Sequence, residues 1–306
     1  MNKKHVYVLS GFLGSGKTTL LKRMITFFQE NGRRPAILMN ELGEVSIDSN
    51  EVEEGTPLRE LLNGCICCTI QGQLESQLQE LLGTECFDDL IIETTGVAHP
   101  VEAIDAIMTP LFADQLEWKG IITVIDSLLW KRKGDLDIQL RQLLHEQVKH
   151  ADLIILNKTD SLSEMERGII TYDVQDLNQI AQIFITNYSE IPMKRIAQLQ
   201  MGEKKSIMKT TVNEHLHLSV YVHTFTKSVD KRQFENWLKK YVDHLYRMKG
   251  YIPFTHTTYP VLFQYSYGMP IYIPEDMNMP TNLVIIGDNL DKEIIENELK
   301  ELEYSS

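Results

Sequence analysis

The sequence contains little cysteine, no excess of positive charge and no long apolar run. Of the four cysteines in 306 residues, three crowd into positions 65–68, which does not suit a disulfide framework. No run reaches the eighteen apolar residues expected of a membrane-spanning helix. The apolar stretch from Val6 to Leu9 is too short for the core of a secretory signal. We therefore expect a cytoplasmic protein without a membrane partner.

Acidic residues outnumber basic ones. The chain carries 43 Asp and Glu against 30 Lys and Arg, which gives a formal net charge of −13 and a pI near 5.2. Nucleic-acid binding usually needs a basic face, so a nucleic-acid partner is not expected. Because 43% of the residues are hydrophobic and 24% charged, the composition is that of an ordinary globular chain with one large or two medium domains.

The first two-thirds of the chain alternates short apolar runs with helical patterns. The runs are nearly continuous in hydrophobicity, as expected for strands of a parallel sheet covered on both faces. This alternation predicts a doubly wound, mostly parallel α/β domain. The expected strands cover 5–10, 35–40, 89–94, 120–126, 152–157 and 182–187, and the expected helices cover 18–31, 74–82, 100–113, 135–150, 163–180 and 190–200.

A polar segment at 201–213 interrupts this alternation and is the expected linker. The pattern beyond it predicts a second, smaller α+β domain with an antiparallel sheet. We place the domains at 1–205 and 214–306. The second domain is expected to contain strands at 216–225, 251–255, 260–266, 270–273 and 282–287, and helices at 231–248 and 291–302.

Residues 11–18 read GFLGSGKT and fit the phosphate-binding pattern G-x-x-x-x-G-K-[ST] at a strand-to-helix turn. Glycines allow the backbone to approach a polyphosphate closely, and the helix that follows directs its positive end at the same phosphates. We expect Lys17 to bridge phosphate oxygens and the Thr18 hydroxyl to bind Mg²⁺. The remaining expected nucleotide-binding residues of the loop are Gly11, Gly14, Ser15, Gly16 and Thr19.

Two further acidic segments are candidates for catalysis and Mg²⁺ binding. Residues 89–96 read DLIIETTG, so Glu93 is expected to hold Mg²⁺ or polarise the attacking water, and Gly96 to approach the γ-phosphate. Asp48 lies in the segment ELGEVSID after the second strand, where a switch loop would cross the Mg²⁺. A solvated acidic loop is the alternative for Asp48.

Residues 157–160 read NKTD and follow another buried strand. The carboxylate of Asp160 can accept hydrogen bonds from N1–H and the 2-amino group of guanine, whereas adenine offers neither donor. Asn157 is expected to support the loop and the base, and Lys158 to lie along the base plane. The motif therefore predicts a preference for GTP.

Three of the cysteines crowd into the motif Cys65-Ile66-Cys67-Cys68. In an extended strand Cys65 and Cys67 share a face and can reach one metal ion, and Cys68 is kept as a further candidate ligand. Two thiolates do not complete a tetrahedral Zn²⁺ site, and Glu41 is a plausible third ligand. A redox pair or packing cysteines are the alternatives. The isolated Cys86 is expected to be a buried small hydrophobe.

Together these motifs resemble the CobW-like family of metal-associated GTPases. The resemblance covers nearly the whole chain. It implies a GTPase domain with a small CobW-type C-terminal domain, metal bound near the switch region by Cys65, Cys67 and Glu41, and GTP-dependent loading of client proteins. The long His-rich tract of many relatives is missing here. His215, His217 and His223 share strand parity, which leaves auxiliary metal binding open beside an ordinary polar strand face. The segments that carry the resemblance are VLSGFLGSGKTTLL, NELGEVSID, LLNGCICCT, IIETTGVAHP, LNKTD and YRMKGYI.

The leading hypothesis is a GTP-dependent metallochaperone for zinc or cobalt, with GTP or GDP, Mg²⁺ and Zn²⁺ (or Co²⁺) as bound species and an unidentified metalloprotein client. The oligomeric state is open and includes a nucleotide-dependent dimer. A metal-responsive regulator that binds a partner protein without delivering metal is the alternative. A P-loop kinase is a third reading, and the guanine-selecting motif argues against it.

Overall fold

Two β-sheets organise the computed structural model, which describes residues 3–39, 58–60, 70–94, 104–105, 107–199, 218–266, 268–288 and 290–304. The chain divides into two compact units. One consists of Lys4–Ala103 and Trp118–His217, and the other of Met1–Lys3, Ile104–Glu117 and Leu218–Ser306. No helix in the described part of the chain combines the length and apolar character needed to cross a bilayer.

The larger sheet, as far as the structure describes it, has seven strands in the order β3-β2-β4-β1-β5-β6-β7. The pairings of β4 with β1 and β2, of β2 with β3, and of β6 with β5 and β7 are parallel. β1 lies between β4 and β5, so the direction in which successive strands are added reverses at β1. In sheets of this kind, ligands bind beyond the carboxyl ends of the strands at this reversal. The strands are β1 Lys4–Ser10, β2 Pro35–Met39, β3 Leu58–Glu60, β4 Asp89–Glu93, β5 Leu116–Asp126, β6 Leu153–Asn157 and β7 Gln182–Ile185.

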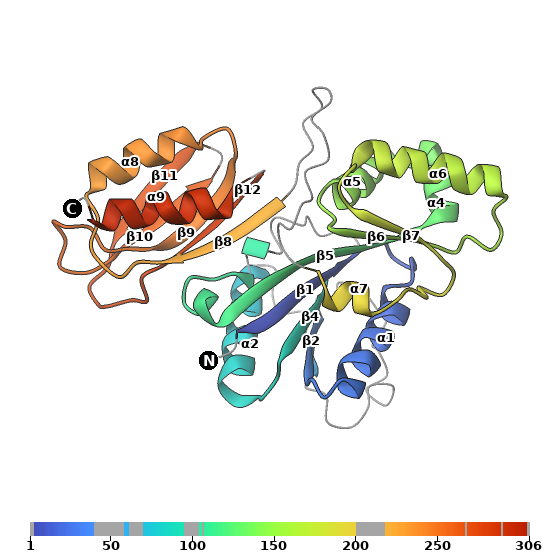
Figure 1. The fold of residues 1–306 in the computed structure, drawn as a ribbon, viewed down its shortest axis with the longest axis horizontal. Coiled ribbons are helices and arrows are strands. Elements are labelled where there is room, and N and C mark those ends of the chain that lie inside the picture. Colours follow the sequence, from blue (N-terminus) through green and yellow to red (C-terminus); the bar gives the residue numbers. More distant parts are fainter. Residues whose placement is uncertain are drawn as a thin grey trace. The chain divides into compact units, whose positions relative to one another are not determined.

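Helices cover both faces of this sheet (Figure 1). On one face, Leu20 and Phe28 of α1 pack in a buried cluster with Tyr7 of β1. On the other face, Trp130 of α4 and Val174 of α6 lie in a second cluster that includes strand residues of β6. The predicted doubly wound fold is therefore confirmed. The helices are α1 Lys17–Glu30, α2 Ile70–Thr84, α4 Ser127–Lys131, α5 Ile138–Lys149, α6 Glu164–Leu177 and α7 Lys194–Ala197, with short 3-10 helices at Ala113–Gln115 and Lys133–Asp135.

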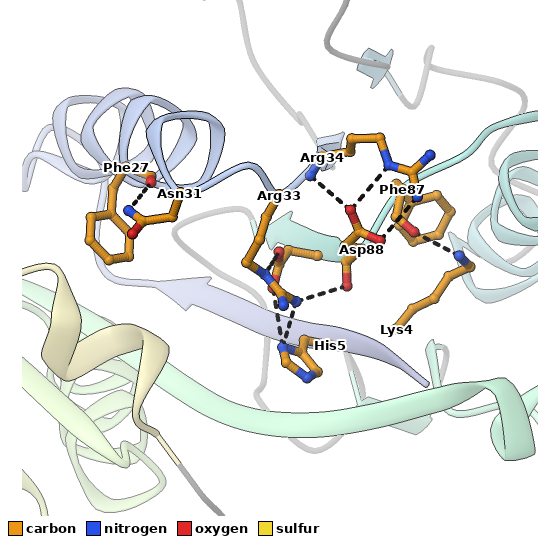
Figure 2. Close-up of polar contacts among 9 residues, drawn as sticks. Lys4, His5, Phe27, Asn31, Arg33, Arg34, Phe87 and Asp88 are labelled. Atoms are coloured by element: carbon orange, nitrogen blue, oxygen red, sulfur yellow. Dashed lines mark hydrogen bonds and ion pairs between the residues drawn. The ribbon is translucent and has the colours of Figure 1, made fainter. Parts of the chain in front are cut away.

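Ion pairs fasten the amino ends of β1, β2 and β4 (Figure 2). Arg33 donates to both carboxylate oxygens of the fully buried Asp89, at 2.5 and 2.8 Å, and lies 2.9 Å from the His5 ring nitrogen. Arg34 makes two hydrogen bonds of 3.1 Å to Asp88, which holds the pKa of that carboxyl down at about 2. These contacts anchor the connection between α1 and β2 at the edge opposite to the phosphate-binding loop.

The second unit is built on a five-stranded sheet in the order β11-β10-β9-β12-β8, with antiparallel pairings throughout the described strands. Its helices lie on one face of the sheet (Figure 1), where Phe234 and Trp237 of α8 and Leu299 of α9 share a cluster with Phe263 of β10. The predicted α+β class is confirmed. The elements are β8 Leu218–Thr224, α8 Lys231–Lys240, β9 Leu245–Ile252, β10 Val261–Ser266, β11 Met269–Pro274, β12 Asn282–Asp288 and α9 Lys292–Tyr304.

The helix expected over 231–248 is wrong in its second half, because α8 ends at Lys240 and β9 begins at Leu245. The pairing of β9 with β12 is irregular between Ile286 and Gly287, so that Gly287 pairs with Leu245 while Ile286 pairs with Arg247. This bulge inserts one extra residue into β9, and the buried Leu245 and Met248 become spaced by three positions. Such spacing imitates one helical turn.

The segment Ile104–Glu117 belongs to the second unit although it lies between the two parts of the first in sequence. Arg247 pairs with Asp105 at 3.0 Å, and the side-chain amide of Asn282 donates to the carbonyl oxygen of Pro110 at 2.9 Å. The helix expected over 100–113 is helical at 104, 105 and 107 and gives way to turns before residue 113. The linker expected at 201–213 lies outside the described residues, and the proposed boundaries 1–205 and 214–306 stay predictions.

Candidate nucleotide-binding site

The phosphate-binding loop follows β1 directly and is held by close backbone packing. Gly11, Gly14 and Gly16 all have positive φ. A Cβ on Gly11 would collide with the carbonyl oxygen of Val124, and one on Gly16 would collide with the side-chain amide of Asn157. Side chains larger than hydrogen are therefore excluded from both places, as the motif requires.

The amino end of α1 offers an uncapped, positively polarised set of N–H groups. Its N-cap residue is Gly16, no side chain caps the helix, and no acidic residue occupies the first turn. Ser15 is buried, Thr18 is half-buried and Thr19 is exposed. Helix N-termini of this kind bind anions, because the first N–H groups have no partner within the helix and the helix dipole favours negative charge.

Lys17 is buried beneath the loop, with only 7% of its surface exposed. Its ammonium donates to the carbonyl oxygens of Gly11, at 2.9 Å, and Phe12, at 3.3 Å. Burial lowers the pKa of Lys17, and the nearby carboxylate of Glu93 partly offsets this effect. A polyphosphate would supply the negative charge that this buried ammonium lacks, so the residues present fit the ligand.

Glu93 ends β4 beside the phosphate-binding loop. It pairs in register with Leu9, and the next residue, Thr94, donates from its N–H and its hydroxyl to the Leu9 carbonyl oxygen, at 3.0 and 3.2 Å. The carboxylate acts electrostatically on Lys17. Glu93 thus lies close to Lys17, and its role as a catalytic or Mg²⁺-binding carboxylate stays a prediction. Gly96, which follows it in the motif, lies outside the described residues.

Asn157 joins the NKTD segment to the phosphate-binding loop. Its amide nitrogen donates to the carbonyl oxygen of Ser15 at 2.8 Å, and its amide oxygen accepts from the backbone N–H of Ser189 at 2.9 Å. The side chain is 3% exposed. Asn157 therefore connects three loops, and its expected support of the nucleotide base stays a prediction.

Lys158 and Asp160 of the motif face solvent more openly, whereas Thr159 is buried. Lys158 adopts left-handed backbone geometry, with φ of 59°, and its ammonium pairs with Asp126 at 2.7 Å. Asp160 is exposed, and its backbone N–H donates to Asn187 at 2.8 Å. The Asp160 side chain is thus free of the core at the sheet edge that carries the phosphate-binding loop.

The loop after β7 was missed by the sequence analysis. The Asn187 side chain accepts hydrogen bonds from the Asp160 N–H and the Thr159 hydroxyl, and Ser189 donates from its hydroxyl to the Gly16 carbonyl oxygen at 3.2 Å. Tyr188 and Ser189 have positive φ, which the surrounding contacts must enforce. The only sequence signal was a polar segment after a strand at the same sheet edge.

The expected metal ligands Glu41, Asp48, Cys65, Cys67 and Cys68 lie outside the described residues. The strands that lead to them are described. β2 ends at Met39, two residues before Glu41, and Met39 pairs in register with both Glu60 of β3 and Glu93 of β4. Among the residues that the structure describes, no group of three His, Cys, Asp or Glu side chains forms a metal site.

The structure bears on two expectations outside these motifs, those for Cys86 and His223. Cys86 is exposed on the connection between α2 and β4, next to Arg34, so the expectation that it is buried is wrong. His223 is 4% exposed and bonds Glu303 at 2.9 Å, and the other Glu303 oxygen accepts from Thr226. His223 therefore ties β8 to α9 rather than facing solvent, while His215 and His217 lie outside the described residues.

The phosphate-binding loop lies where the strand order reverses, and Asn157 joins it to an NKxD segment at the same edge of the sheet. This combination defines a P-loop nucleotide-binding protein. Residues 5–185 match the family model described as CobW/HypB/UreG, nucleotide-binding domain, and residues 218–303 match the Cobalamin synthesis protein cobW C-terminal domain. The chain belongs to the CobW/HypB/UreG family. The predicted family resemblance is thereby confirmed.

Relatives match the chain along nearly its whole length. The zinc chaperone YjiA of Escherichia coli K12 is 29% identical over 96% of this chain and 97% of its own. The zinc chaperone CobW of Pseudomonas aeruginosa is 27% identical over 97% of this chain and 91% of its own. The crystal structure of Zn(II)-bound YjiA GTPase from E. coli is 25% identical, with a TM-score of 0.53 and 99% of both chains covered.

Proposed function

We propose that this protein binds and hydrolyses GTP and uses the nucleotide to control binding of zinc, which it delivers to a client protein. The relatives named as zinc chaperones support the metal, and the family's nucleotide-binding domain supports the nucleotide. The observation that carries the proposal is a register row across four strands at one sheet edge, Leu9–Glu93–Met39–Glu60.

The nucleotide end of this row is β1. The phosphate-binding loop begins two residues after Leu9, and the described loop presents uncapped N–H groups and the buried Lys17 to a polyphosphate. Glu93 is the candidate for polarising the attacking water or holding Mg²⁺, with Thr18 and Asp48 as the other Mg²⁺ candidates. Bound Mg²⁺ would neutralise charge on the phosphates. Asp160 would select guanine through its exposed carboxylate.

The metal end of the row is formed by β2 and β3. Glu41 follows Met39 by two residues and Cys65 follows Glu60 by five in sequence, and Met39 and Glu60 end two adjacent parallel strands. Thiolate with carboxylate is a ligand set suited to Zn²⁺ or Co²⁺. Leu9 and Glu60 are separated by roughly 14 Å, three inter-strand spacings of about 4.8 Å. A chain segment that spans this distance can contact both the nucleotide and the zinc ion.

Coupling follows from that proximity. The connection from β2 to β3 contains Glu41 and Asp48, which are candidates for zinc and Mg²⁺, respectively. An Mg–GTP complex that orders this connection would bring the carboxylate of Glu41 to the thiolates of Cys65 and Cys67, and hydrolysis would release it. Zinc bound in the GTP state would then pass to a client in the GDP state.

The metal half is tested by Zn²⁺ titration of the full-length protein against a chromophoric chelator, with Mg²⁺ and a non-hydrolysable GTP analogue present. Cys67→Ala should weaken Zn²⁺ binding at least tenfold and leave GTP affinity unchanged. Cys86→Ala is the matched control, because Cys86 is exposed at the opposite edge of the sheet. Equal Zn²⁺ affinity in both variants and the wild-type protein would contradict the assignment.

A further inference from the structure

Asp126, the last residue of β5, uses its two carboxylate oxygens for different purposes. Oδ1 accepts hydrogen bonds from the backbone N–H groups of Leu128, at 2.9 Å, and Leu129, at 3.1 Å, and so caps α4. Oδ2 accepts from the ammonium of Lys158 at 2.7 Å. Capping of α4 uses only Oδ1, so it does not account for the hydrogen bond between Oδ2 and Lys158.

Lys158 is placed for this contact by the sheet. Asp126 pairs in register with Asn157, the residue before Lys158, so the two side chains leave adjacent parallel strands at their carboxyl ends. The Asp126 side chain is 16% exposed and that of Lys158 is 40% exposed. A half-exposed lysine otherwise samples many rotamers, and a less exposed, capped carboxylate fixes the position of its ammonium.

The backbone of Lys158 adds to this constraint. Its φ of 59° is unfavourable for a residue with a Cβ, and the preceding Asn157 is held by Ser15 and Ser189. Both ends of the Lys158 side chain, the Cα in a left-handed turn and the ammonium on Asp126, are therefore set by contacts outside the NKTD segment. The methylene stem between them is therefore confined, and Asp160 follows two residues later in the same segment.

We propose that Asp126 is a positioning residue for guanine recognition. It holds the ammonium of Lys158 so that the methylene stem lies along the plane of the base, while the Asp160 carboxylate binds the guanine edge. This inference rests on the proposed guanine-nucleotide binding. In this role Asp126 acts on the nucleotide only through Lys158, whose ammonium its Oδ2 accepts from.

Two other roles of Asp126 give different outcomes. If Asp126 only caps α4, a serine in its place preserves function, because serine is an equally good N-cap residue. If the ion pair is a latch that nucleotide must open, its removal makes nucleotide binding tighter. A positioning role requires weaker binding after a substitution that keeps the cap, and no further weakening once the lysine amine is already gone.

The test uses Asp126→Ser, Lys158→Met and the double variant of the full-length protein. Methionine keeps an unbranched stem without the ammonium. Affinities for GDP, IDP and ADP are measured by displacement of ribose-labelled GDP, and steady-state GTP hydrolysis gives KM and kcat. Thermal unfolding of each nucleotide-free variant reports whether α4 remains folded.

We expect Asp126→Ser to weaken GDP and GTP binding by about the same factor, three- to tenfold, because the base is common to both nucleotides. KM for GTP should rise by that factor with kcat at saturation unchanged, since Asp126 does not reach the phosphates. In the Lys158→Met background the serine substitution should add nothing. This non-additivity is the signature of two residues that act as one unit.

Unchanged or tighter GDP binding in Asp126→Ser overturns the inference, as do additive effects in the double variant or a fall in kcat larger than the rise in KM. If Asp126→Ser unfolds, Asp126→Asn takes its place in the same cycle, because its amide oxygen can still cap α4 while its NH₂ group cannot accept from Lys158. A wild-type protein that binds GDP no better than ADP refutes the proposed function itself. Preserved guanine preference with no effect at Asp126 refutes only the positioning role.

Discussion

The side-chain amide of Asn157 donates a hydrogen bond of 2.8 Å to the carbonyl oxygen of Ser15, which joins the NKTD segment to the phosphate-binding loop across 142 positions of sequence. The Asn157 amide oxygen also accepts the N–H of Ser189. One buried amide therefore connects the loops that follow β1, β6 and β7, and it fixes the NKTD segment, which is proposed to bind the base, relative to the phosphate-binding loop.

Replacement of Asn157 by alanine should damage folding stability and nucleotide binding together. The substitution leaves the buried carbonyl of Ser15 and the N–H of Ser189 without their partner, at a cost of about 1–3 kcal/mol in the free energy of unfolding. Urea denaturation and GDP titration measure the two effects. Asn31→Ala is the control, since its amide donates at the exposed end of α1 (Figure 2) and should change stability by less than about 0.5 kcal/mol. Equal effects of both substitutions would contradict the linkage.

Gly16→Ala should abolish measurable nucleotide binding, whereas Gly14→Ala should have a smaller effect. Both glycines have positive φ, so both substitutions carry a backbone cost of about 1 kcal/mol. Only at Gly16 does the added Cβ meet the Asn157 amide, while at Gly14 there is open space within 4 Å. Isothermal titration with GDP separates the two. If Gly14→Ala lost as much GDP affinity as Gly16→Ala, backbone strain rather than the clash with Asn157 would be the cause of the lost binding.

Asp160→Asn should lower the affinity for GTP and raise that for xanthosine triphosphate. Xanthine carries a carbonyl where guanine has its 2-amino group, and an asparagine amide can donate to that oxygen whereas a carboxylate cannot. Loss of two charge-assisted hydrogen bonds should cost GTP about 10- to 100-fold in affinity, because each 1.4 kcal/mol is tenfold. Competition titrations with GTP, xanthosine triphosphate and ATP measure the change. Strict retention of GTP preference in this variant would refute the role of Asp160.

Acid should weaken the amino end of the larger sheet through Asp88. The hydrogen bonds from Arg34 lower the pKa of Asp88 from 3.8 to about 2 in the folded protein (Figure 2). A depressed carboxyl pKa contributes stability above pH 3.8, and that contribution is lost as the pH falls from about 4 towards 2. The stability difference between wild type and Asp88→Asn should therefore shrink over this range in urea denaturation. A difference independent of pH would exclude the ion pair as its source.

The sequence predicted the elements that depend on local pattern. Continuous apolar runs identified β1, β4 and β6, because strands covered on both faces bury every side chain. The glycine pattern located the phosphate-binding loop, since its backbone geometry admits no other residue at Gly11 and Gly16. These signals are contained in neighbouring residues and need no tertiary information.

Other features arise from contacts between distant segments and could not be predicted. The strand β9 was read as helix because a bulge spaces Leu245 and Met248 by three, and the bulge exists only in the pairing with β12. The Asp126–Lys158 ion pair spans two strands, and the motif alone does not name its partner. Cys86 was expected to be buried from its apolar neighbours, whereas its position at the turn before β4 exposes it.

The most direct test of the proposed function compares Zn²⁺ affinity in two nucleotide states. Full-length protein with Mg²⁺ is titrated with Zn²⁺ against a chelator in the presence of GDP or a non-hydrolysable GTP analogue. Lys17→Ala, which removes the buried ammonium of the phosphate-binding loop, is the control that should abolish any difference. At least tenfold tighter Zn²⁺ binding with the GTP analogue in the wild-type protein is the expected result, and equal affinities in the two states would contradict the coupling of nucleotide to metal.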